Sequence, residues 1–344
     1  MSRHSTLGLA LVTLVVTLAF GQPPSTTLLV LSKSDHTVSI VDPATLQVLA
    51  RIPSGPDPHE IIASDDGKLA YISNYGGPDS TLNTISVVDL VARKSLPAID
   101  LGALHSAHGL DFAGSKLYFT AETNKVIGRY DPATQHIDWI LGTGEDRTHM
   151  ILVANGLTKM FTSNVNSATI SIIEQRSPPS GGFNPPGGPR LTWEVTNVPA
   201  GQGCEGFDIS PDGKEIWAAN AHDATVTIID VAAKKAIQTL PIPVKGANRL
   251  KFTPDGKRVL ISALGARSGD ASLVVLDAST RKEVKQLNLG GGSAGILIAP
   301  DGSRAYVAVS MADKVAVIDL KTLEVSGEIS AGKQPDGLAW AITK

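Results

Sequence analysis

The feature that most constrains this chain is a unit of about 46 residues that recurs along its length. In each clear copy an apolar stretch leads through a turn into a second strand, a third strand that ends in an acidic residue, and a fourth strand. The turns lie at residues 65–68, 210–214, 254–257 and 300–302, with weaker copies at 113–114 and 155–156. Asp-Gly and Asn-Gly between alternating apolar runs indicate tight hairpins, because these residues tolerate positive φ. The pattern predicts an all-β repeat protein.

The count of strands predicts that the array closes on itself. Seven third strands end in an acidic residue, but only six turns join a first strand to a second. The seven acidic residues are Asp42, Asp89, Asp131, Glu174, Asp230, Asp277 and Asp319. Residues 335–343 are predicted to form a first strand with no partner after it, and residues 28–53 begin at a second strand. Joining them leaves no open sheet edge.

We therefore predict that residues 22–344 form one seven-bladed β-propeller of four-stranded antiparallel blades. Its first blade would consist of residues 28–53 plus 335–343, so that the C-terminal strand pairs with the N-terminal blade. Composition agrees with a globular fold, at 42% hydrophobic and 18% charged residues. We expect a monomer.

Three second strands resemble the YVTN-family β-propeller repeat. They are Tyr71-Ile72-Ser73-Asn74, Trp217-Ala218-Ala219-Asn220 and Tyr306-Val307-Ala308-Val309, each followed by a Val/Ile-rich strand that ends in Asp. The resemblance covers essentially the whole chain after residue 21 and implies that the first strand of each blade lines the central channel. The family includes exported proteins and is distantly similar to lactonase-like, quinoprotein and cytochrome d1-like propellers, so it transfers no catalytic residue. Heme d1 propellers have eight blades, and seven blades predict no heme here.

The N-terminus has the pattern of a secretory signal peptide over residues 1–21. Basic residues precede an apolar run from Leu7 to Phe20, and small residues follow at the expected cleavage site. The run is shorter than the roughly 20 residues that a membrane-spanning helix needs. We expect a periplasmic or secreted protein without stable membrane insertion, the alternative being a retained N-terminal anchor.

Charge and motifs exclude several functional classes. With 30 basic and 33 acidic residues, the net charge of -3 provides no excess positive field for nucleic acid. The single cysteine, Cys204, excludes an internal disulfide and a Cys-rich metal site. The sequence has no phosphate-binding loop, dinucleotide fingerprint, EF-hand loop or serine nucleophile elbow, so no nucleotide is expected.

Aligning the starts of the seven first strands reveals one column rich in metal-ligating residue types. The column consists of His59, His108, His149, Glu205, Asn248, Ala294 and Asp336. Three histidines on consecutive blades, with a carboxylate on the next, suit a divalent transition metal such as Zn or Cu. We predict His59, His108 and His149 as metal ligands and Glu205 as a catalytic proton carrier, with a histidine as the alternative carrier. Asp57 and Glu60 would orient the imidazoles. The alternative is a ring of solvated histidines that binds channel water.

Further polar residues are predicted at the same end of the blades. Candidate substrate-binding residues are Arg147, Arg249, Asn74, Asn164, Asn220 and Asp336, with Glu122, Lys33 and His222 on the same face. The three asparagines end second strands, where turn hydrogen bonding is the alternative role. Two long loops, residues 75–83 and 264–270, would overhang the mouth, whereas the Pro/Gly-rich segment 177–189 is predicted as a surface loop on the opposite side.

Two functions of different classes follow from these residues. The first is a metal-dependent hydrolase or lyase that acts on a small molecule at the channel mouth. The second is an exported scaffold without catalytic activity that binds a ligand or a protein there. The sequence alone does not decide between an enzyme and a scaffold.

Overall fold

The computed structural model describes residues 26–154, 156–177 and 191–343. The predicted signal peptide, residues 1–21, and nearly all of the segment 177–189 lie outside these ranges. Within the described chain, no helix is long and apolar enough to cross a membrane.

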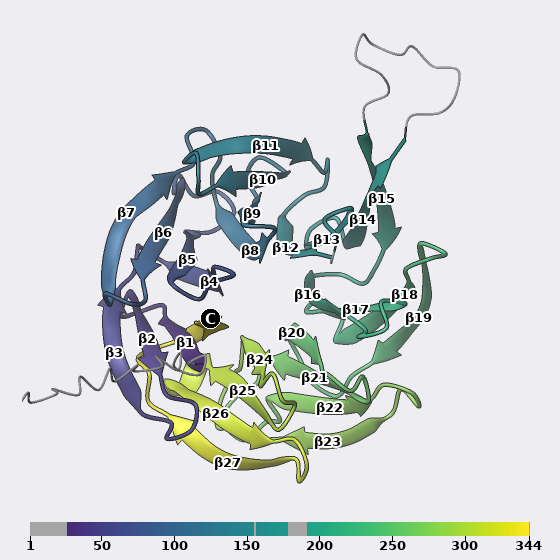
Figure 1. Ribbon diagram of the computed structural model, residues 1–344. Helices are drawn as coiled ribbons and strands as arrows, with labels where there is room; N and C mark the ends of the chain where they lie inside the picture. The colour runs from purple at the N-terminus through teal and green to yellow at the C-terminus, as the bar shows by residue number, and fades with distance from the viewer. Residues whose placement is uncertain (1–25, 155, 178–190, 344) are drawn as a thin grey trace, which may run out of the picture.

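The described chain forms seven four-stranded antiparallel sheets arranged in a ring (Figure 1), which confirms the predicted seven-bladed β-propeller. Blade 1 contains β28 (Pro335–Ile342), β1 (Thr26–Ser32), β2 (Thr37–Val41) and β3 (Val48–Pro53). Blade 2 contains β4 (Pro58–Ala63), β5 (Leu69–Asn74), β6 (Thr84–Asp89) and β7 (Lys94–Asp100). Blade 3 contains β8 (Ala107–Ala113), β9 (Lys116–Ala121), β10 (Val126–Asp131) and β11 (His136–Gly142).

The remaining blades repeat this order from the inside outward. Blade 4 contains β12 (Thr148–Val153), β13 (Lys159–Asn164), β14 (Thr169–Arg176) and β15 (Thr192–Pro199). Blade 5 contains β16 (Cys204–Ile209), β17 (Glu215–Asn220), β18 (Thr225–Asp230) and β19 (Lys235–Pro241). Blade 6 contains β20 (Ala247–Phe252), β21 (Arg258–Ala263), β22 (Leu273–Asp277) and β23 (Glu283–Leu287). Blade 7 contains β24 (Ile296–Ile298), β25 (Arg304–Val309), β26 (Lys314–Asp319) and β27 (Glu324–Ile329), with the short 3-10 helix η1 (Ser310–Ala312) after β25.

The first blade combines the two ends of the described chain. Strand β28 pairs antiparallel with β1, and Leu28 lies opposite Trp340. The C-terminal strand is therefore the innermost strand of a sheet whose other three strands come from the N-terminal part of the chain.

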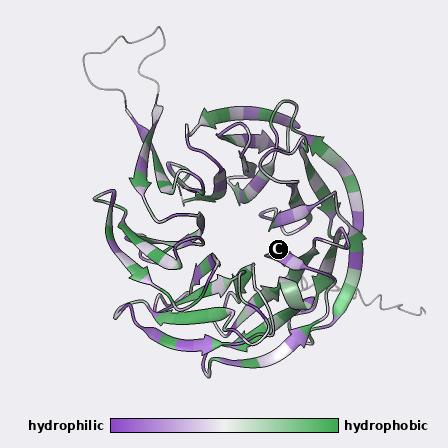
Figure 2. Cartoon of the chain, turned by 180° about the vertical axis from the view of Figure 1, so that it is seen from behind, coloured by the Kyte–Doolittle hydropathy of each residue, from purple (hydrophilic) through white to green (hydrophobic). Residues whose placement is uncertain are grey.

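The core lies between neighbouring blades and is built by the repeat itself. Tyr71, Phe161, Trp217 and Tyr306 hold the same position in four second strands, and each is at most 2% exposed. Trp217 packs edge-on against Phe252 of the next blade, with ring centroids 5.6 Å apart. The outermost strands alternate hydrophobic and hydrophilic residues along their length (Figure 2), because only one of their faces is covered. This packing fixes each inner strand against the channel.

Candidate functional site at the channel mouth

The predicted column residues all line one cavity at the mouth of the channel. The cavity has a volume of about 310 Å³, and its lining includes His59, His108, His149, Glu205, Asn248, Ala294 and Asp336. Each belongs to an innermost strand or, for Ala294, to the residues just before β24. The structure thus brings together side chains that are up to 277 positions apart, between His59 and Asp336.

β-Bulges direct these column side chains out of the regular sheet. In blade 3 the pairing of β8 with β9 shifts register between Ala107 and Leu110, so His108 lies within the bulge. The same shift surrounds His59, His149, Glu205 and Asn248 in their blades. A bulge leaves a residue out of the ladder and re-aims its side chain. The repeat therefore produces a ring of redirected side chains.

Hydroxyl groups on the second strands hold the bulges in place. Thr120 Oγ1 accepts a hydrogen bond from the Gly109 backbone N–H at 2.9 Å and donates one to the His149 carbonyl oxygen at 2.7 Å. Ser163 likewise contacts the Met150 amide and the Glu205 carbonyl. Each hydroxyl thus ties the bulge of its own blade to the column residue of the next.

Close approach between these blades requires a glycine at one position. A Cβ on Gly109 would lie 2.5 Å from the His149 carbonyl oxygen, which is closer than real contacts allow. The absence of a side chain there lets the backbones of β8 and β12 approach each other, and His108 and His149 come into contact as a result.

Two charged residues occupy strained backbone positions immediately before the inner strands. Asp57 and Arg147 have φ values of 42° and 58°, whereas the equivalent residues of two other blades are Gly203 and Gly246. A left-handed conformation costs a residue with a side chain about 1 kcal/mol or more. Both side chains contact residues of the site. Asp57 contacts His59, and Arg147 contacts Glu122 and Glu205.

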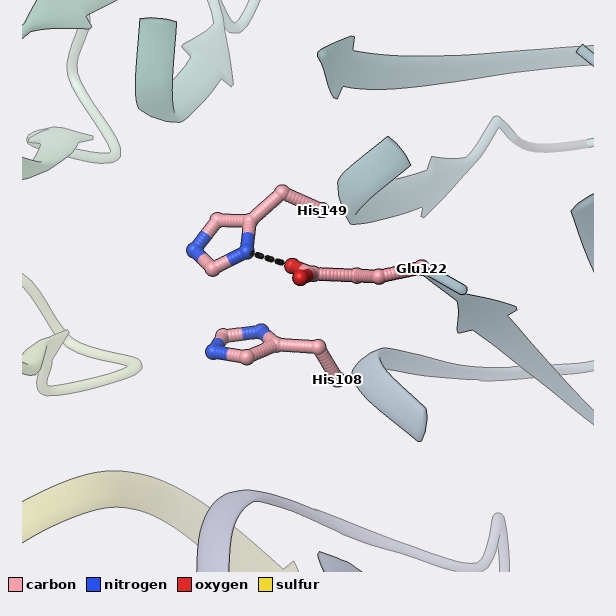
Figure 3. Close-up of side chains that lie close together, drawn as sticks. All are labelled: His108, Glu122 and His149. Carbon is pink, nitrogen blue, oxygen red and sulfur yellow. Dashed lines mark hydrogen bonds and ion pairs between the residues drawn. The ribbon is translucent and has the colours of Figure 1, made fainter. Parts of the chain in front are cut away.

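The compact centre of the site consists of His108, Glu122 and His149 (Figure 3). These three buried residues offer ligand atoms that all lie within 4.8 Å of one another. The rings of His108 and His149 pack against each other with centroids 3.7 Å apart, and Glu122 forms an ion pair and hydrogen bond with His149 Nδ1. Glu122 follows β9, and Tyr75 Oη donates a hydrogen bond to its Oε2 at 2.6 Å.

His149 lies between two carboxylates. Its Nδ1 faces Glu122, and its Nε2 lies 3.0 Å from Glu205 Oε2 in an ion-pair contact that is not a hydrogen bond. Burial alone would lower the pKa of His149, but the attraction of Glu205 and Glu122 outweighs burial and raises it. Burial likewise favours the neutral form of Glu205, yet His149, Arg249 and Arg147 lower its pKa to about 2.

His108 has the opposite electrostatic environment although it is equally buried. Both His108 and His149 are 2% exposed, and His108 Nδ1 has no hydrogen-bond partner. Burial and the neighbouring positive charges, led by His149, lower the pKa of His108 well below its usual range. His108 is therefore a neutral imidazole with a buried nitrogen that lacks a partner, which suits a metal ligand.

His59 lies at the edge of this centre, against Tyr75 and His108. Its ring centroid is 5.2 Å from that of His108 and 4.7 Å from that of Tyr75. His59 Nε2 lies 3.2 Å from Asp57 Oδ2 and its Nδ1 lies 3.6 Å from Asp336 Oδ2. All three predicted histidines thus gather at one cavity, but the compact set of ligand atoms pairs His108 and His149 with Glu122 rather than with His59.

The two arginines are engaged with carboxylates of the protein. Arg147 Nε lies 3.4 Å from Glu122 Oε2, and its Nη1 lies 3.6 Å from Glu205 Oε1. Arg249 Nη2 lies 2.5 Å from Glu60 Oε1, on an inner strand across the channel from β20. Arg147 contacts are longer than the 2.7–2.9 Å typical of strong charge-assisted hydrogen bonds. Arg147, at 22% exposure of its side chain, is therefore the more available of the two to a ligand.

The mouth carries an excess of negative charge. Its ion-pair network contains five carboxylates, Asp57, Glu60, Glu122, Glu205 and Asp336, and three cations, Lys33, Arg147 and Arg249. Histidines that ligate a metal are neutral, and the network then has two more negative than positive charges, which one divalent cation would balance. Without a metal, the raised pKa of His149 favours a proton there that offsets one of these charges.

The predicted asparagines do not line this cavity. Asn74, Asn164 and Asn220 are at most 1% exposed, and each side-chain amide donates to two hydroxyl groups on the third strand of its own blade. This arrangement corresponds to the alternative structural role for a strand-ending asparagine. His222 is exposed outside the cavity, and burial raises the pKa of Cys204 to about 12.

Two important residues were not singled out by the aligned column. Tyr75 begins the long loop 75–83 and supports Glu122, which the sequence placed only on the same face. Both follow the end of a second strand, so an alignment of that position across blades would have found them.

Comparisons with known proteins place the chain among propellers of several activities. A family model described as the cytochrome D1 heme domain matches residues 187–299. No curated protein matches the chain. The solved structures that are similar include a hydrazine synthase from Kuenenia stuttgartiensis, at 17% identity and a TM-score of 0.66, covering 82% of this chain and 89% of that chain.

A putative 6-phosphogluconolactonase from Bacteroides uniformis is similar at 14% identity with a TM-score of 0.71, covering 93% of this chain and 100% of that one. The dihydro-heme d1 dehydrogenase NirN, solved in complex with DHE, is similar at 15% identity and a TM-score of 0.62, covering 91% of this chain and 74% of that one. These likenesses show the fold alone. The chain is a β-propeller similar to cytochrome d1 and lactonase-like propellers.

The mouth does not fit a heme. Its volume of about 310 Å³ is at the lower end for small-molecule sites, and the Arg249–Glu60 ion pair joins opposite sides of the channel. The imidazoles of His108 and His149 have ring centroids 3.7 Å apart, so a planar macrocycle cannot lie between them.

Proposed function

We propose that this propeller is a metal-dependent hydrolase or lyase that acts on a small molecule at its channel mouth. The convergence of His108, Glu122 and His149 within 4.8 Å carries the proposal. Two imidazoles and one carboxylate are an established donor set of catalytic zinc sites, which keep a further position open. The excess of carboxylates over Lys and Arg side chains in the mouth is compatible with a divalent cation such as Zn or Cu.

The surrounding residues have the partners that a metal site needs. Tyr75 and Arg147 contact Glu122 and hold its carboxylate in place, while Glu205 faces the Nε2 of His149. A carboxylate on the second ring nitrogen of a histidine ligand fixes the ring and increases its basicity. When bound, the metal would polarise a carbonyl group or lower the pKa of a bound water.

We assign proton transfer to His59 in place of Glu205. A carboxyl group with a pKa of about 2 remains ionised at neutral pH and is a poor proton donor. His59 faces the same cavity and is oriented by Asp57 and Asp336, as a histidine that transfers protons requires. Arg147 is the candidate for contacting an anionic group of the substrate.

We also propose a cellular location and an oligomeric state. The predicted signal peptide would place the reaction in the periplasm or outside the cell, with the protein as a monomer. The putative 6-phosphogluconolactonases among the similar propellers favour a hydrolytic reaction. At 14% and 16% identity they add no residue assignment.

The decisive experiment measures zinc binding by calorimetry on protein purified without a histidine tag and stripped with a chelator. We expect one equivalent of zinc per chain. His108→Gln and Glu122→Gln should each weaken binding at least about 100-fold, and Glu205→Gln, which acts through His149, about 10- to 100-fold. His222→Gln is the matched control, since it removes an exposed histidine outside the cavity.

Activity is then screened with esters and lactones on the zinc-loaded protein. Turnover that requires both zinc and His108 supports the enzyme. Zinc content below about a tenth of an equivalent, unchanged on metal addition, would contradict the metal site and favour a scaffold that binds a ligand or protein without catalysis.

A further inference from the structure

The mouth cavity has two chemically different walls. His59, His108, His149 and Tyr75 line one side, together with charged groups. Blades 6 and 7 contribute the uncharged residues Leu264, Ala294, Ser310 and Met311 to the lining, beside Asn248 and Arg249 of β20. Leu264 and Met311 are 42% and 68% exposed, although both are large apolar residues. Exposed apolar surface within a polar cavity indicates contact with an apolar part of a ligand.

Leu264 and Met311 are held beside each other by the backbone. A Cβ on Gly292 would lie 2.2 Å from the Leu264 carbonyl oxygen and 3.2 Å from Met311 Cγ, so only glycine permits this approach. The Leu264 amide donates to the Gly246 carbonyl at 2.8 Å, and the Met311 amide donates to the Gly292 carbonyl at 3.2 Å. The two side chains therefore come from fixed positions on separate blades, and we call them the apolar wall.

We propose that the ligand of this site is an amphiphile with a short straight acyl chain. Its carboxyl or carbonyl head would lie at the centre formed by His108, Glu122 and His149, and its alkyl chain would cover the apolar wall. This inference rests on the proposed function for the placement of the head group. The volume of about 310 Å³ limits the chain, because longer chains extend beyond the cavity into solvent.

The chain-length dependence of binding tests the apolar wall directly. Straight-chain carboxylates from acetate to decanoate are titrated into the zinc-loaded protein by calorimetry, after zinc binding has been measured. Burying one more methylene contributes about 0.8 kcal/mol to the free energy of binding, so affinity should rise about fourfold per methylene until the chain extends beyond the cavity.

Variants of nearly equal size separate this effect from head-group binding. The double variant Leu264→Asn, Met311→Gln should reduce the increase to less than about twofold per methylene and leave acetate affinity unchanged. Leu49→Asn is the matched control, because Leu49 lies on the outermost strand β3 and is 44% exposed. It should retain the wild-type slope.

Failure of this inference differs from failure of the metal site. If zinc binds but affinity is independent of chain length, or if the double variant keeps the slope, the acyl ligand is overturned. The carboxylate series is then repeated on metal-free protein. There the affinity should still increase with each methylene, although overall binding is weaker, because the apolar wall contains no metal ligand. A flat series there overturns the inference even if zinc never binds.

Discussion

The channel mouth and the face that bears the Asp-Gly turns both carry carboxylates at repeated positions, but they use them differently. On the turn face, Asp66 accepts hydrogen bonds from the Ser64 hydroxyl and the Lys68 amide, and Asp212 and Asp255 repeat this pattern with the residues two positions before and after them. In the mouth, Glu60 pairs with Arg249, which is 189 positions away.

This difference separates the residues that build the repeat from those that build the site. A turn carboxylate stabilises only its own hairpin and is exposed to water and salt. A mouth carboxylate connects blades and is largely buried, so its loss leaves an unpaired charge. The comparison predicts that equal chemical changes at the two faces have unequal effects.

The largest effect is expected for Arg249→Met, which removes the cation between Glu60 and Glu205. Because Arg249 and its two partners are at most 15% exposed, the free energy of unfolding should fall by about 3–5 kcal/mol in denaturant titrations. Lys257→Met breaks the exposed Lys257–Asp255 pair of the turn face, at 3.7 Å, and should cost less than about 1 kcal/mol. Equal losses would refute the comparison.

The second effect concerns the pH dependence of stability in metal-free protein. Glu205 has its pKa lowered from 4.5 to about 2, so it stabilises the fold above pH 4.5 and loses this contribution as pH falls toward 2. His149 has its pKa raised from 6.5, so its contribution is complete below pH 6.5 and is lost as pH rises through the raised value. Both groups therefore contribute fully to the free energy of unfolding between pH 4.5 and pH 6.5.

Glu205→Gln should therefore lower stability most between pH 4.5 and 6.5, by on the order of 3 kcal/mol, and progressively less below pH 4.5. Urea unfolding at a series of pH values measures the difference. Asp212→Asn is the turn-face control, since the pKa of Asp212 is also about 2 but its side chain is exposed. Added salt should diminish the part of the Asp212 effect that comes from its exposed pair with Lys214, and should change the buried Glu205 effect less. A Glu205 effect that is constant over pH would contradict the assigned pKa shifts.

The same division explains how much of the molecule could be predicted from sequence. The turns, the seven blades and the column of His59, His108 and His149 depend on local pattern and strand count. Glu122 and Tyr75 share a repeat position just after a second strand, but their contacts with His149 and His108 depend on the curvature of the ring, which no local pattern records. The structural role of the asparagines, by contrast, could be predicted locally. The hydroxyl groups that accept hydrogen bonds from Asn164 and Asn220 lie five and seven positions later in the chain.

Asp255→Ala on the turn face should have a smaller effect than Arg249→Met or Glu205→Gln at the mouth. Asp255 accepts hydrogen bonds from the Thr253 hydroxyl at 2.6 Å and from the Lys257 amide at 3.0 Å. Since both donors are solvated when the acceptor is removed, the free energy of unfolding should fall by only about 1 kcal/mol. Zinc affinity should equal that of the wild type, because this carboxylate contacts no residue of the mouth. A weakened zinc site in Asp255→Ala would mean that the hairpin turns transmit their geometry to the channel, and the two faces would then not be independent.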